Sequence, residues 1–374
     1  MKKAVVVLPT YNEAGNIEKM LESLNKIIRT VHNWDIQIMV VDDSSPDGTG
    51  KIVKKLMGGT KNLHLIIGKK QGLGKAYVNG FRNALEKLNP FVLFEMDADL
   101  SHDPLLIPVM LKKIEEGADF VIGSRYMKGG GIPANWGLNR KIYSITANLF
   151  IRFGFMNLKV HDWSSGYRAI RAWVVKDMLT DLEKYNGYIF QIALLDKAIK
   201  KNAIIEEVPL KFVDREKGVS KINAREFITN IFGYLLQNSG FVKFVIVGFI
   251  GFGIDFSIAY VLIKFITDNK PLANGISSEF AIICNFFLNN FWSFRHKQIT
   301  GGLTAFVPKL LLFNIVSSGN ILIQAVGMYV ALLLLGDTVL LGVPTWIIYK
   351  IGIIAFLIIP YSYFMYNKII WKKK

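Results

Sequence analysis

Acidic side chains follow three short apolar runs in this 374-residue chain. Asp97 and Asp99 come directly after the run FVLFEM. The run IQIMVV precedes Asp42 and Asp43. The run AVVVL is followed by PTYNE, whose last residue is Glu13. A divalent cation that bridges a diphosphate needs oxygen ligands that leave room for the phosphates, and one or two carboxylates on a turn supply them. An Asp-rich turn also arises from backbone hydrogen bonding alone, but the other two acidic strand ends favour a metal–diphosphate site.

These acidic segments belong to a regular alternation of strands and helices. Short β-branched runs predict strands, and amphipathic segments predict helices. The expected strands are 4–8, 36–41, 63–67, 91–96 and 120–122, and the expected helices are 16–30, 48–57, 74–88 and 104–117. Such alternation predicts an α/β fold of Rossmann-like type, with a mainly parallel sheet covered on both faces. Ligands bind outside the carboxyl ends of such strands, so the acidic segments should meet at one edge.

The second part of the chain has a different composition. The whole chain is 51% hydrophobic, with a mean hydropathy of +0.32, and the excess lies after residue 240. Four apolar segments have the length of a membrane span: about 241–266, 272–294, 306–335 and 342–370. We therefore expect two domains, a catalytic domain at 1–240 and an all-α transmembrane domain of four helices at 241–374. Lys and Arg gather in the loop between the second and third segments and after the fourth, which predicts that both termini and the catalytic domain are cytoplasmic.

Polar residues within the apolar segments are costly and could mark a polar pathway; hydrogen bonding between helices is the alternative that we favour. They are Asp255, Glu279, Asn285, Asn289 and Asn290. Two amphipathic helices are expected in the first domain, at about 138–155 and 222–238. Each could lie in a membrane interface or pack its apolar stripe on the domain core.

The net charge of the chain limits the kinds of molecule that it is expected to bind. The chain has 45 Lys and Arg against 29 Asp and Glu, a net charge of +16. A basic domain joined to a membrane domain indicates anionic lipid headgroups or an anionic substrate. Arginine-rich tracts, zinc-ligand spacing and RNA-binding aromatic motifs are missing from the sequence, so we expect no nucleic-acid partner. The single cysteine, Cys284, excludes an intrachain disulfide.

Four motifs carry a resemblance to a known family. The segments VVLPTYNE at 6–13, VVDDSSPDGT at 40–49, MDADLSH at 96–102 and GSRY at 123–126 resemble the family-2 inverting glycosyltransferases of GT-A fold. Their order and spacing are most similar to the dolichol-phosphate mannose synthases and related polyprenyl-phosphate glycosyltransferases. This resemblance covers residues 1 to about 225, and the four-span tail resembles the GtrA-like membrane domain of some members.

The resemblance implies roles for residues at the matching positions. A sugar nucleotide would be bound by Pro9, Tyr11, Glu13, Val41, Asp43, Asp97, Ala98, Arg215 and Lys221. Mg²⁺ or Mn²⁺ would be held on the diphosphate by Asp97 and Asp99, with Ser101 on the metal side. Some members have Gln where this chain has Ser101, and the shorter hydroxyl implies a water between Ser101 and the metal.

The resemblance also implies a receptor for the lipid phosphate, made of Arg125, Arg140 and Ser144. Cations and a hydroxyl at a membrane interface suit that task. The implied catalytic residues are Asp99, Arg125 and Arg215, the last of which would stabilise the departing nucleotide. A phosphate monoester is largely dianionic at pH 7, so it can attack without a general base. The polar run at 161–168 borders the sugar and acceptor in that family, where Asp162 is either functional or part of a structural turn.

We therefore expect an enzyme that transfers mannose from GDP-mannose to dolichyl or another polyprenyl phosphate. The alternative within the same class is glucose transfer from UDP-glucose to the same kind of lipid. The alternative from another class is a flippase for lipid-linked sugars or a membrane scaffold, in which the globular half only binds.

Overall fold

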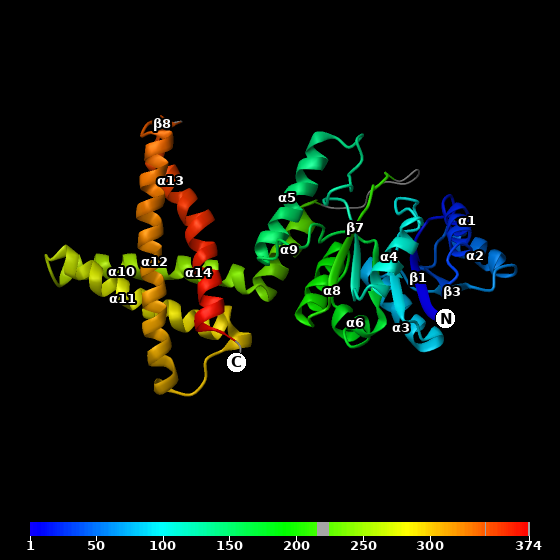
Figure 1. Ribbon diagram of the computed structural model, residues 1–374, viewed down its shortest axis with the longest axis horizontal. Coiled ribbons are helices and arrows are strands. Elements are labelled where there is room, and N and C mark those ends of the chain that lie inside the picture. Colours follow the sequence, from blue (N-terminus) through cyan, green and yellow to red (C-terminus); the bar gives the residue numbers. More distant parts are fainter. Residues whose placement is uncertain (215–223, 341, 373–374) are drawn as a thin grey trace. The chain divides into compact units, whose positions relative to one another are not determined.

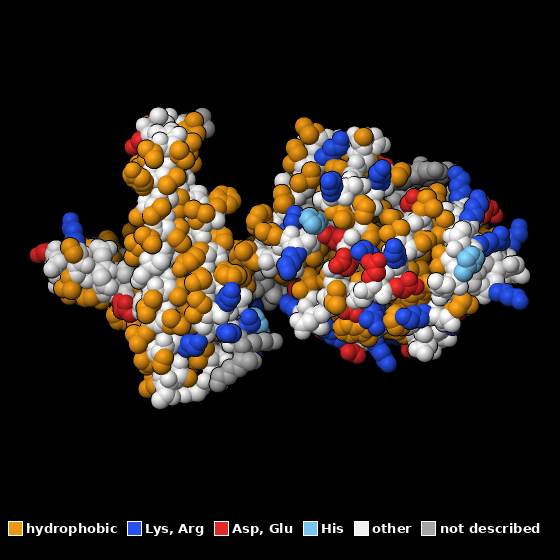
Figure 2. Space-filling model, in the orientation of Figure 1, with side chains coloured by type: hydrophobic (Ala, Val, Ile, Leu, Met, Phe, Trp, Pro, Cys, Tyr) orange, Lys and Arg blue, Asp and Glu red, His pale blue; other side chains and the backbone are white. Residues whose placement is uncertain are grey.

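The computed structural model describes residues 1–214, 224–340 and 342–372. The chain divides into two compact units, Met1–Tyr234 and Leu235–Lys374. Figure 2 shows how they differ in surface chemistry: hydrophobic side chains cover most of the visible face of the second unit, whereas charged side chains are interspersed over the first.

The first unit is built on a seven-stranded sheet with the order β3-β2-β1-β4-β6-β5-β7. The strands are β1 Lys2–Thr10, β2 Trp34–Asp42, β3 Leu63–Ile67, β4 Val92–Glu95, β5 Phe120–Ser124, β6 Arg168–Arg171 and β7 Ile205–Pro209. All neighbouring pairs are parallel except those of β6, which runs antiparallel to β4 and β5. The predicted α/β fold with a mainly parallel sheet is confirmed. The five predicted strands are present, while β6 and β7 were not foreseen.

Helices cover both faces of this sheet (Figure 1). The helices of this part of the chain are α1 Ile17–Ile28, α2 Thr49–Met57, α3 Leu73–Leu88, α4 Leu106–Glu115, α5 Leu138–Gly154, α6 Ala172–Lys176, α7 Leu179–Leu182, α8 Tyr188–Lys200 and α9 Ala224–Asn238, the last of which continues past Tyr234. The apolar stripes of α1, α2 and α4 form one core with alternate strand residues such as Val6 and Val40. On the opposite face α3 packs so closely that a Cβ at Gly80 would lie 2.4 Å from Val7 Cγ1, so only glycine fits there.

The second unit is helical. Its main elements are α10 Gly240–Phe265, α11 Lys270–Leu288, α12 Leu303–Leu335 and a last helical stretch, α13 Thr345–Ile353, η3 Ile354–Ile358, α14 Ile359–Met365 and η4 Tyr366–Ile370. Two short helical segments, η1 Asn289–Ser293 and η2 Arg295–Lys297, follow α11, and a small hairpin, β8 Val339–Leu340 and β9 Val343–Pro344, precedes α13. The hairpin means that the unit is not wholly α-helical.

Three helices of the second unit are long and apolar enough to cross a membrane: Gly240–Phe265, Leu303–Leu335 and Thr345–Ile370. The remaining predicted span corresponds to α11, which is a helix of 19 residues but does not reach the same combination of length and apolarity. Aromatic side chains pack together in the core of this unit. Within this core Phe294 stacks on Trp371, with ring centroids 4.5 Å apart.

Candidate functional site

The three acidic segments meet at one edge of the sheet. The register pairs Thr10 with Asp42 and Val7 with Glu95, so β1, β2 and β4 end side by side. This confirms the expectation that the carboxyl ends of these strands bring the acidic loops together. Pro9 and Val41, two predicted nucleotide contacts, are themselves opposite each other in the β1–β2 ladder.

The two adjacent aspartates after β2 have different surroundings. Asp42 is buried, and its Oδ1 accepts hydrogen bonds from Thr10 Oγ1 at 3.0 Å and Ser45 Oγ at 2.5 Å. Asp42 therefore connects the end of β1 to the loop that follows β2. Asp43 instead lines a cavity, where burial and the neighbouring charge of Asp42 raise the pKa of its carboxyl.

Each of the three loops contains a non-glycine residue with positive φ: Asn12 at 62°, Ser44 at 53° and Leu100 at 66°. Such a backbone conformation costs of order 1 kcal/mol and persists only where the surroundings enforce it. Asn adopts this conformation more readily than most residues, but Leu does not. Backbone strain of this kind gathers at functional sites, and here it falls between Asp99 and Ser101.

The turn after β4 orients Asp99. Its Oδ1 accepts hydrogen bonds from the backbone N–H of Ser101 at 3.1 Å and from the Ser101 hydroxyl at 2.6 Å. The backbone N–H of Asp97 donates to His102 Nδ1 at 3.0 Å, which requires that nitrogen to be unprotonated. Burial lowers the pKa of His102 to about 4, so the ring is neutral. Asp99 is buried, whereas the side chain of Asp97 is 37% exposed.

This turn fits a divalent cation of the magnesium type. Within the described part of the chain no group of three or more His, Cys, Asp or Glu side chains could hold a metal ion. Mg²⁺ does not need one, because it takes one or two carboxylates and completes its shell with water and substrate phosphates. Asp97 and Asp99 supply two carboxylates on one turn. The hydroxyl of Ser101 is directed at Asp99, so its first effect is to orient that carboxylate.

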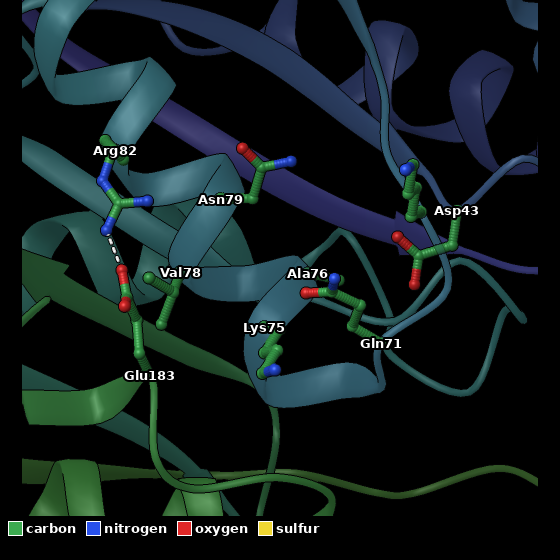
Figure 3. Close-up of a pocket in the computed structure, with 9 residues that line it drawn as sticks. Asp43, Gln71, Lys75, Ala76, Val78, Asn79, Arg82 and Glu183 are labelled. Atoms are coloured by element: carbon green, nitrogen blue, oxygen red, sulfur yellow. Dashed lines mark hydrogen bonds and ion pairs between the residues drawn. The ribbon is translucent and has the colours of Figure 1, made fainter. Parts of the chain in front are cut away.

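A cavity of about 380 Å³ opens beside Asp43 (Figure 3). Helix α3 forms one wall, and Figure 3 shows Lys75, Asn79 and Arg82 along it. Lys69, Gln71 and Glu183 also line it, and Arg82 is paired with Glu183. Its volume is within the range of small-ligand sites. Outside this cavity, the ammonium of Lys70 lies 3.6 Å from the ring centre of Tyr11, another predicted nucleotide contact.

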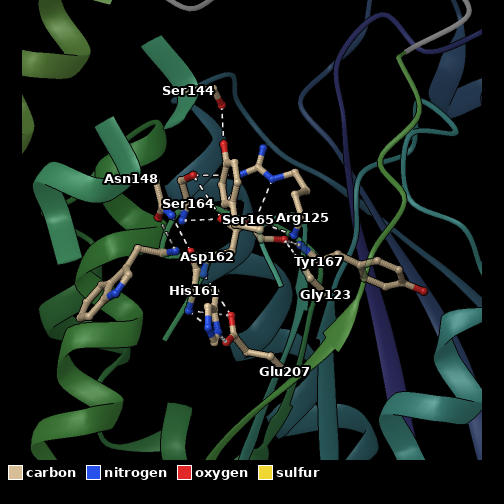
Figure 4. Close-up of polar contacts among 12 residues, drawn as sticks. Gly123, Arg125, Ser144, Asn148, His161, Asp162, Ser164, Ser165, Tyr167 and Glu207 are labelled. Carbon is tan, nitrogen blue, oxygen red and sulfur yellow. Dashed lines mark hydrogen bonds and ion pairs between the residues drawn. The ribbon is translucent and has the colours of Figure 1, made fainter. Parts of the chain in front are cut away.

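A second polar cluster is centred on Arg125, directly after β5 (Figure 4). Its Nε donates to Asp162 Oδ2 at 2.7 Å, and its Nη2 donates to Asp162 Oδ1 at 2.9 Å and Ser164 Oγ at 2.8 Å. The side chains of Arg125 and Asp162 are 12% and 0% exposed. Burial alone would raise the pKa of Asp162, but the charge and hydrogen bonds of Arg125 outweigh it and hold the pKa below its usual value.

Helix α5 is fastened to this cluster by two side chains. The amide of Asn148 accepts from the backbone N–H of Trp163 at 3.1 Å and donates to the carbonyl of His161 at 2.5 Å. Ser144 Oγ lies 2.6 Å from the hydroxyl of Tyr126. Consequently Ser144, a predicted contact of the acceptor phosphate, lies beside the residue that follows Arg125.

Arg140, near the start of α5, lies farther out. Its guanidinium stacks on Trp136 at 3.8 Å from the ring centre, and its Nη1 is 3.3 Å from Asp214 Oδ2. The structure thus brings Arg125 and Ser144 into one cluster and gives the exposed Arg140 a separate, half-buried partner in Asp214. Arg215 and Lys221, the predicted diphosphate contacts, lie outside the described residues.

Arg168 ends the polar run 161–168, but its burial and its partners were not predicted from the sequence. Arg168 is fully buried and donates to the carbonyls of Gln191 at 2.8 Å and Trp163 at 3.0 Å, and its Nη1 is 3.7 Å from Glu95 Oε2. Burial raises the pKa of Glu95 to about 8 despite the charge of Arg168. Arg168 therefore joins the strand that precedes Asp97 to the loop that holds Arg125. A glutamate inside the apolar run FVLFEM was the available signal.

Comparison with known proteins identifies the family. Residues 5–179 match the glycosyl transferase family 2 model. The chain is also 31% identical over 360 residues to a dolichol-phosphate mannosyltransferase of Pyrococcus furiosus, a match that covers 94% of this chain and 96% of the relative. The chain belongs to glycosyltransferase family 2. Residues 243–371 match the GtrA/DPMS transmembrane domain. The predicted resemblance is confirmed in both domains, and the chain is a glycosyltransferase with a membrane domain.

Two further relatives match a smaller part of this chain. A polyprenol monophosphomannose synthase of Mycolicibacterium smegmatis is 39% identical over 59% of this chain and 82% of its own length. An undecaprenyl-phosphate mannosyltransferase of Micrococcus luteus is 38% identical over 59% of this chain and 88% of its own. A solved mannosyltransferase of Pyrobaculum calidifontis, in complex with GDP-Man and Mn²⁺, is 14% identical with a TM-score of 0.42, over 98% of this chain and 87% of that one.

Proposed function

We propose that this glycosyltransferase transfers mannose from GDP-mannose to dolichyl or another polyprenyl phosphate, giving polyprenyl-phosphate-mannose and GDP. The observation that carries the proposal is the match to the dolichol-phosphate mannosyltransferase of Pyrococcus furiosus over 94% of this chain. The relatives from Mycolicibacterium smegmatis and Micrococcus luteus are likewise named for mannose and polyprenyl lipids. Membership of a transferase family favours this activity over a flippase or a scaffold.

In the proposed reaction an oxygen of the lipid phosphate attacks the anomeric carbon of mannose. A new C–O bond forms as the bond to the nucleotide diphosphate breaks, and the electron pair leaves with GDP. Inversion of the anomeric carbon follows from attack on the face opposite the leaving group. The lipid phosphate is dianionic near pH 7, so this step needs no general base.

The residues of the site have separate tasks in this reaction. Asp97 and Asp99 would hold Mg²⁺ or Mn²⁺, which would offset the charge of the diphosphate when bound. Asp43 would receive donors of the nucleoside at the mouth of the cavity that it lines. Arg125, whose guanidinium is fixed by Asp162, would present its remaining exposed part to the lipid phosphate together with Ser144.

The proposed acceptor requires access from a bilayer. Helix α5 exposes several large apolar side chains, namely Leu138, Ile142, Tyr143, Ile145, Leu149, Phe150 and Phe153. These suit an interfacial helix that admits a lipid phosphate to Arg125 and Ser144. The distribution of Lys and Arg in the loops of the second unit supports a cytoplasmic catalytic domain with both termini on the same side.

One assay tests donor and acceptor together. Membranes that contain the chain are incubated with radiolabelled GDP-mannose or UDP-glucose, dolichyl phosphate, and Mg²⁺ or Mn²⁺, and the label that enters the organic phase is counted. We expect mannose to enter and to be absent when the lipid phosphate or the metal is omitted. Glucose entry without mannose entry would replace the donor with UDP-glucose, the second candidate.

A further inference from the structure

The cavity beside Asp43 is lined by one amide to which the family resemblance assigns no role. This amide belongs to Asn79 on α3, which lines the cavity together with Asp43 and Gln71. Figure 3 shows Asn79 on the part of α3 that borders the space next to Asp43. An amide has a donor end and an acceptor end, so its orientation decides which groups of a ligand it can bind.

A neighbouring side chain fixes the orientation of this amide. Asn83, one turn later on α3, donates through Nδ2 to the backbone carbonyl of Asn79 at 3.0 Å and to Asn79 Oδ1 at 3.0 Å. The reverse orientation would place two amino groups against each other. Within the described part of the chain, no group accepts a hydrogen bond from Asn79 Nδ2. Asn79 therefore offers N–H donors to the cavity.

The carboxylate of Asp43 provides an acceptor next to these donors. A Cβ at Gly68, the residue that follows β3, would lie 3.1 Å from Asp43 Oδ1 and 3.6 Å from Asn79 Nδ2. The two polar atoms thus lie near one point, and glycine leaves that point open. The backbone N–H of Gln71 also donates a hydrogen bond to Asp43 and helps to fix its carboxylate. A carboxylate acceptor and an amide donor therefore lie side by side.

The other charged side chains of the cavity are less suited to recognising a nucleobase. Arg82 is paired with Glu183, so its guanidinium already has a carboxylate partner. Lys69 and Lys75 are exposed, and an ammonium on a flexible stem carries charge with little directional preference. The carboxylate and the amide are the two groups whose direction is fixed by the surrounding structure.

The order of these two groups matches the hydrogen-bonding edge of one nucleobase. A carboxylate can accept two parallel hydrogen bonds, so it pairs best with two adjacent donors. Guanine has such an edge, the N1–H and the N2 amino group, and its O6 beside them accepts from an amide. In uracil the single N3–H lies between two carbonyl oxygens, one of which would face the carboxylate. Adenine and cytosine have an unprotonated ring nitrogen beside their amino group, which would also oppose it.

We propose that Asn79, oriented by Asn83, is a specificity-determining residue of the donor site. It selects a guanine nucleotide by donating to O6, while Asp43 accepts from N1–H and the N2 amino group. This inference rests on the proposed function, which places the sugar nucleotide at this edge of the sheet, and it adds the residue that distinguishes GDP from UDP. A site built to hydrogen-bond a polar group rejects a ligand that lacks it.

Calorimetric titration of the full-length chain in detergent with Mg²⁺ tests the inference. The ligands are GDP, inosine diphosphate, which lacks the N2 amino group, 6-thio-GDP, in which sulfur replaces O6, and UDP. The parent should bind UDP at least about 100-fold more weakly than GDP, and the other two about tenfold more weakly. Asn79→Leu should raise the Kd for GDP about tenfold and make it equal to that for 6-thio-GDP, because the contact to O6 is already lost.

Three further comparisons separate recognition from general damage. In Asn79→Leu, inosine diphosphate should still bind about tenfold more weakly than GDP, because the contact of Asp43 to the N2 amino group remains. Asn83→Leu frees the amide and should raise the Kd for GDP severalfold. Glu86→Gln, at an exposed residue of α3 that does not line the cavity, is the control and should bind every nucleotide as the parent does.

The possible outcomes distinguish this inference from the proposed function. If sulfur at position 6 weakens binding to the parent and to Asn79→Leu by the same factor, Asn79 does not contact O6 and the inference is wrong. An equal loss for all four nucleotides in Asn79→Leu would show only a structural role and would also overturn it. Tighter binding of UDP than of GDP by the parent would overturn the guanine assignment and the proposed donor together. Selective binding of GDP without mannose transfer to lipid phosphate would contradict the proposed function alone.

Discussion

The carboxylate of Asp99 is oriented by its own turn before any substrate binds. Ser101 provides two donors to Asp99 Oδ1, and the strained Leu100 between them, at a φ of 66°, is held in place by that arrangement. Both the strain and the burial of a carboxylate are costs that a purely structural turn would avoid. This residue therefore has the features of a group that was positioned for binding.

Replacing Asp99 by Asn should abolish most sugar transfer while the domain stays folded. The amide keeps the size of the side chain but removes the charge that would hold a divalent cation, so we expect a loss of about 100-fold or more in transfer rate. Label from GDP-mannose in lipid phosphate is the measurement. Asp103→Asn is the matched control on the same loop, because Asp103 Oδ1 only accepts from the backbone N–H of Leu105. Equal activity in both variants would remove Asp99 from the site.

The ion pair of Arg125 and Asp162 should contribute to stability in a pH-dependent way. The pKa of Asp162 is lowered in the folded state, because the effect of Arg125 exceeds that of burial. A carboxyl with a depressed folded pKa contributes stability above its unfolded pKa, near ~3.9, and loses it as the pH falls through the folded value. Asp162→Asn also leaves the buried guanidinium unpaired, which costs about 3–5 kcal/mol.

Thermal unfolding in detergent between pH 3 and 8 checks this prediction. The variant should be clearly less stable than the parent at pH 7, and the difference should narrow below about pH 4 as the parent loses its charged carboxylate. Asp177→Asn disrupts an exposed pair with Lys201, 3.0 Å long, and should change stability by less than about 1 kcal/mol. A difference between parent and Asp162→Asn that is independent of pH would contradict the charged pair.

Helix α5, which we propose meets the lipid, is joined to Arg125 through one loop. Asn148 connects the helix to the backbone of residues 161 and 163, and Asp162 between them fixes Arg125. The position of the helix and that of the guanidinium are therefore coupled through one loop. The hydrogen bonds of this loop to Glu207 on β7 hold its other side.

Asn148→Ala should weaken use of the acceptor more than use of the donor. Loss of two hydrogen bonds frees α5 from the loop, so we expect the KM for lipid phosphate to rise about tenfold while the KM for GDP-mannose changes little. Steady-state kinetics with each substrate varied in turn gives both values. Thr146→Ala on the same helix removes a hydroxyl that bonds only within α5 and should leave both KM values unchanged. Parallel increases in both constants would indicate general damage.

The strands that carry the acidic loops were predictable because each is a run of β-branched or aromatic apolar residues followed by polar residues. Strand β6 was not predictable, because Arg168–Arg171 is short and half basic and reads as part of a loop. Its partners come from distant segments, and only the fold shows that Arg168 is buried between Glu95 and Trp163. The pairing of Arg125 with Asp162 likewise joins residues 37 positions apart. Glu95 inside the apolar run FVLFEM indicates a buried charge, but no local pattern in the sequence identifies the partner in either pair.

Each of the two units has its own core, so the first unit should fold without the helical one. The first unit, Met1–Tyr234, contains the sheet and every described residue assigned to sugar transfer. Within it Tyr234 of α9 donates to Asp196 on α8 at 2.8 Å, so a useful truncation must retain α9. Under the proposed function we expect the helical unit to serve contact with the lipid, and the acidic site to be complete without it.

A chain that ends at residue 240 should therefore keep its activity on lipid phosphate dispersed in detergent. We expect a transfer rate within about threefold of the full chain on a short prenyl phosphate, because detergent delivers the acceptor without a membrane domain. On long-chain dolichyl phosphate in vesicles, the rate should fall at least tenfold relative to the full chain, since fewer molecules of the truncated enzyme reside at the bilayer. The truncated chain with Asp99→Asn is the control for background transfer. Loss of activity in detergent by a truncated chain that unfolds cooperatively would instead place part of the catalytic site in the helical unit.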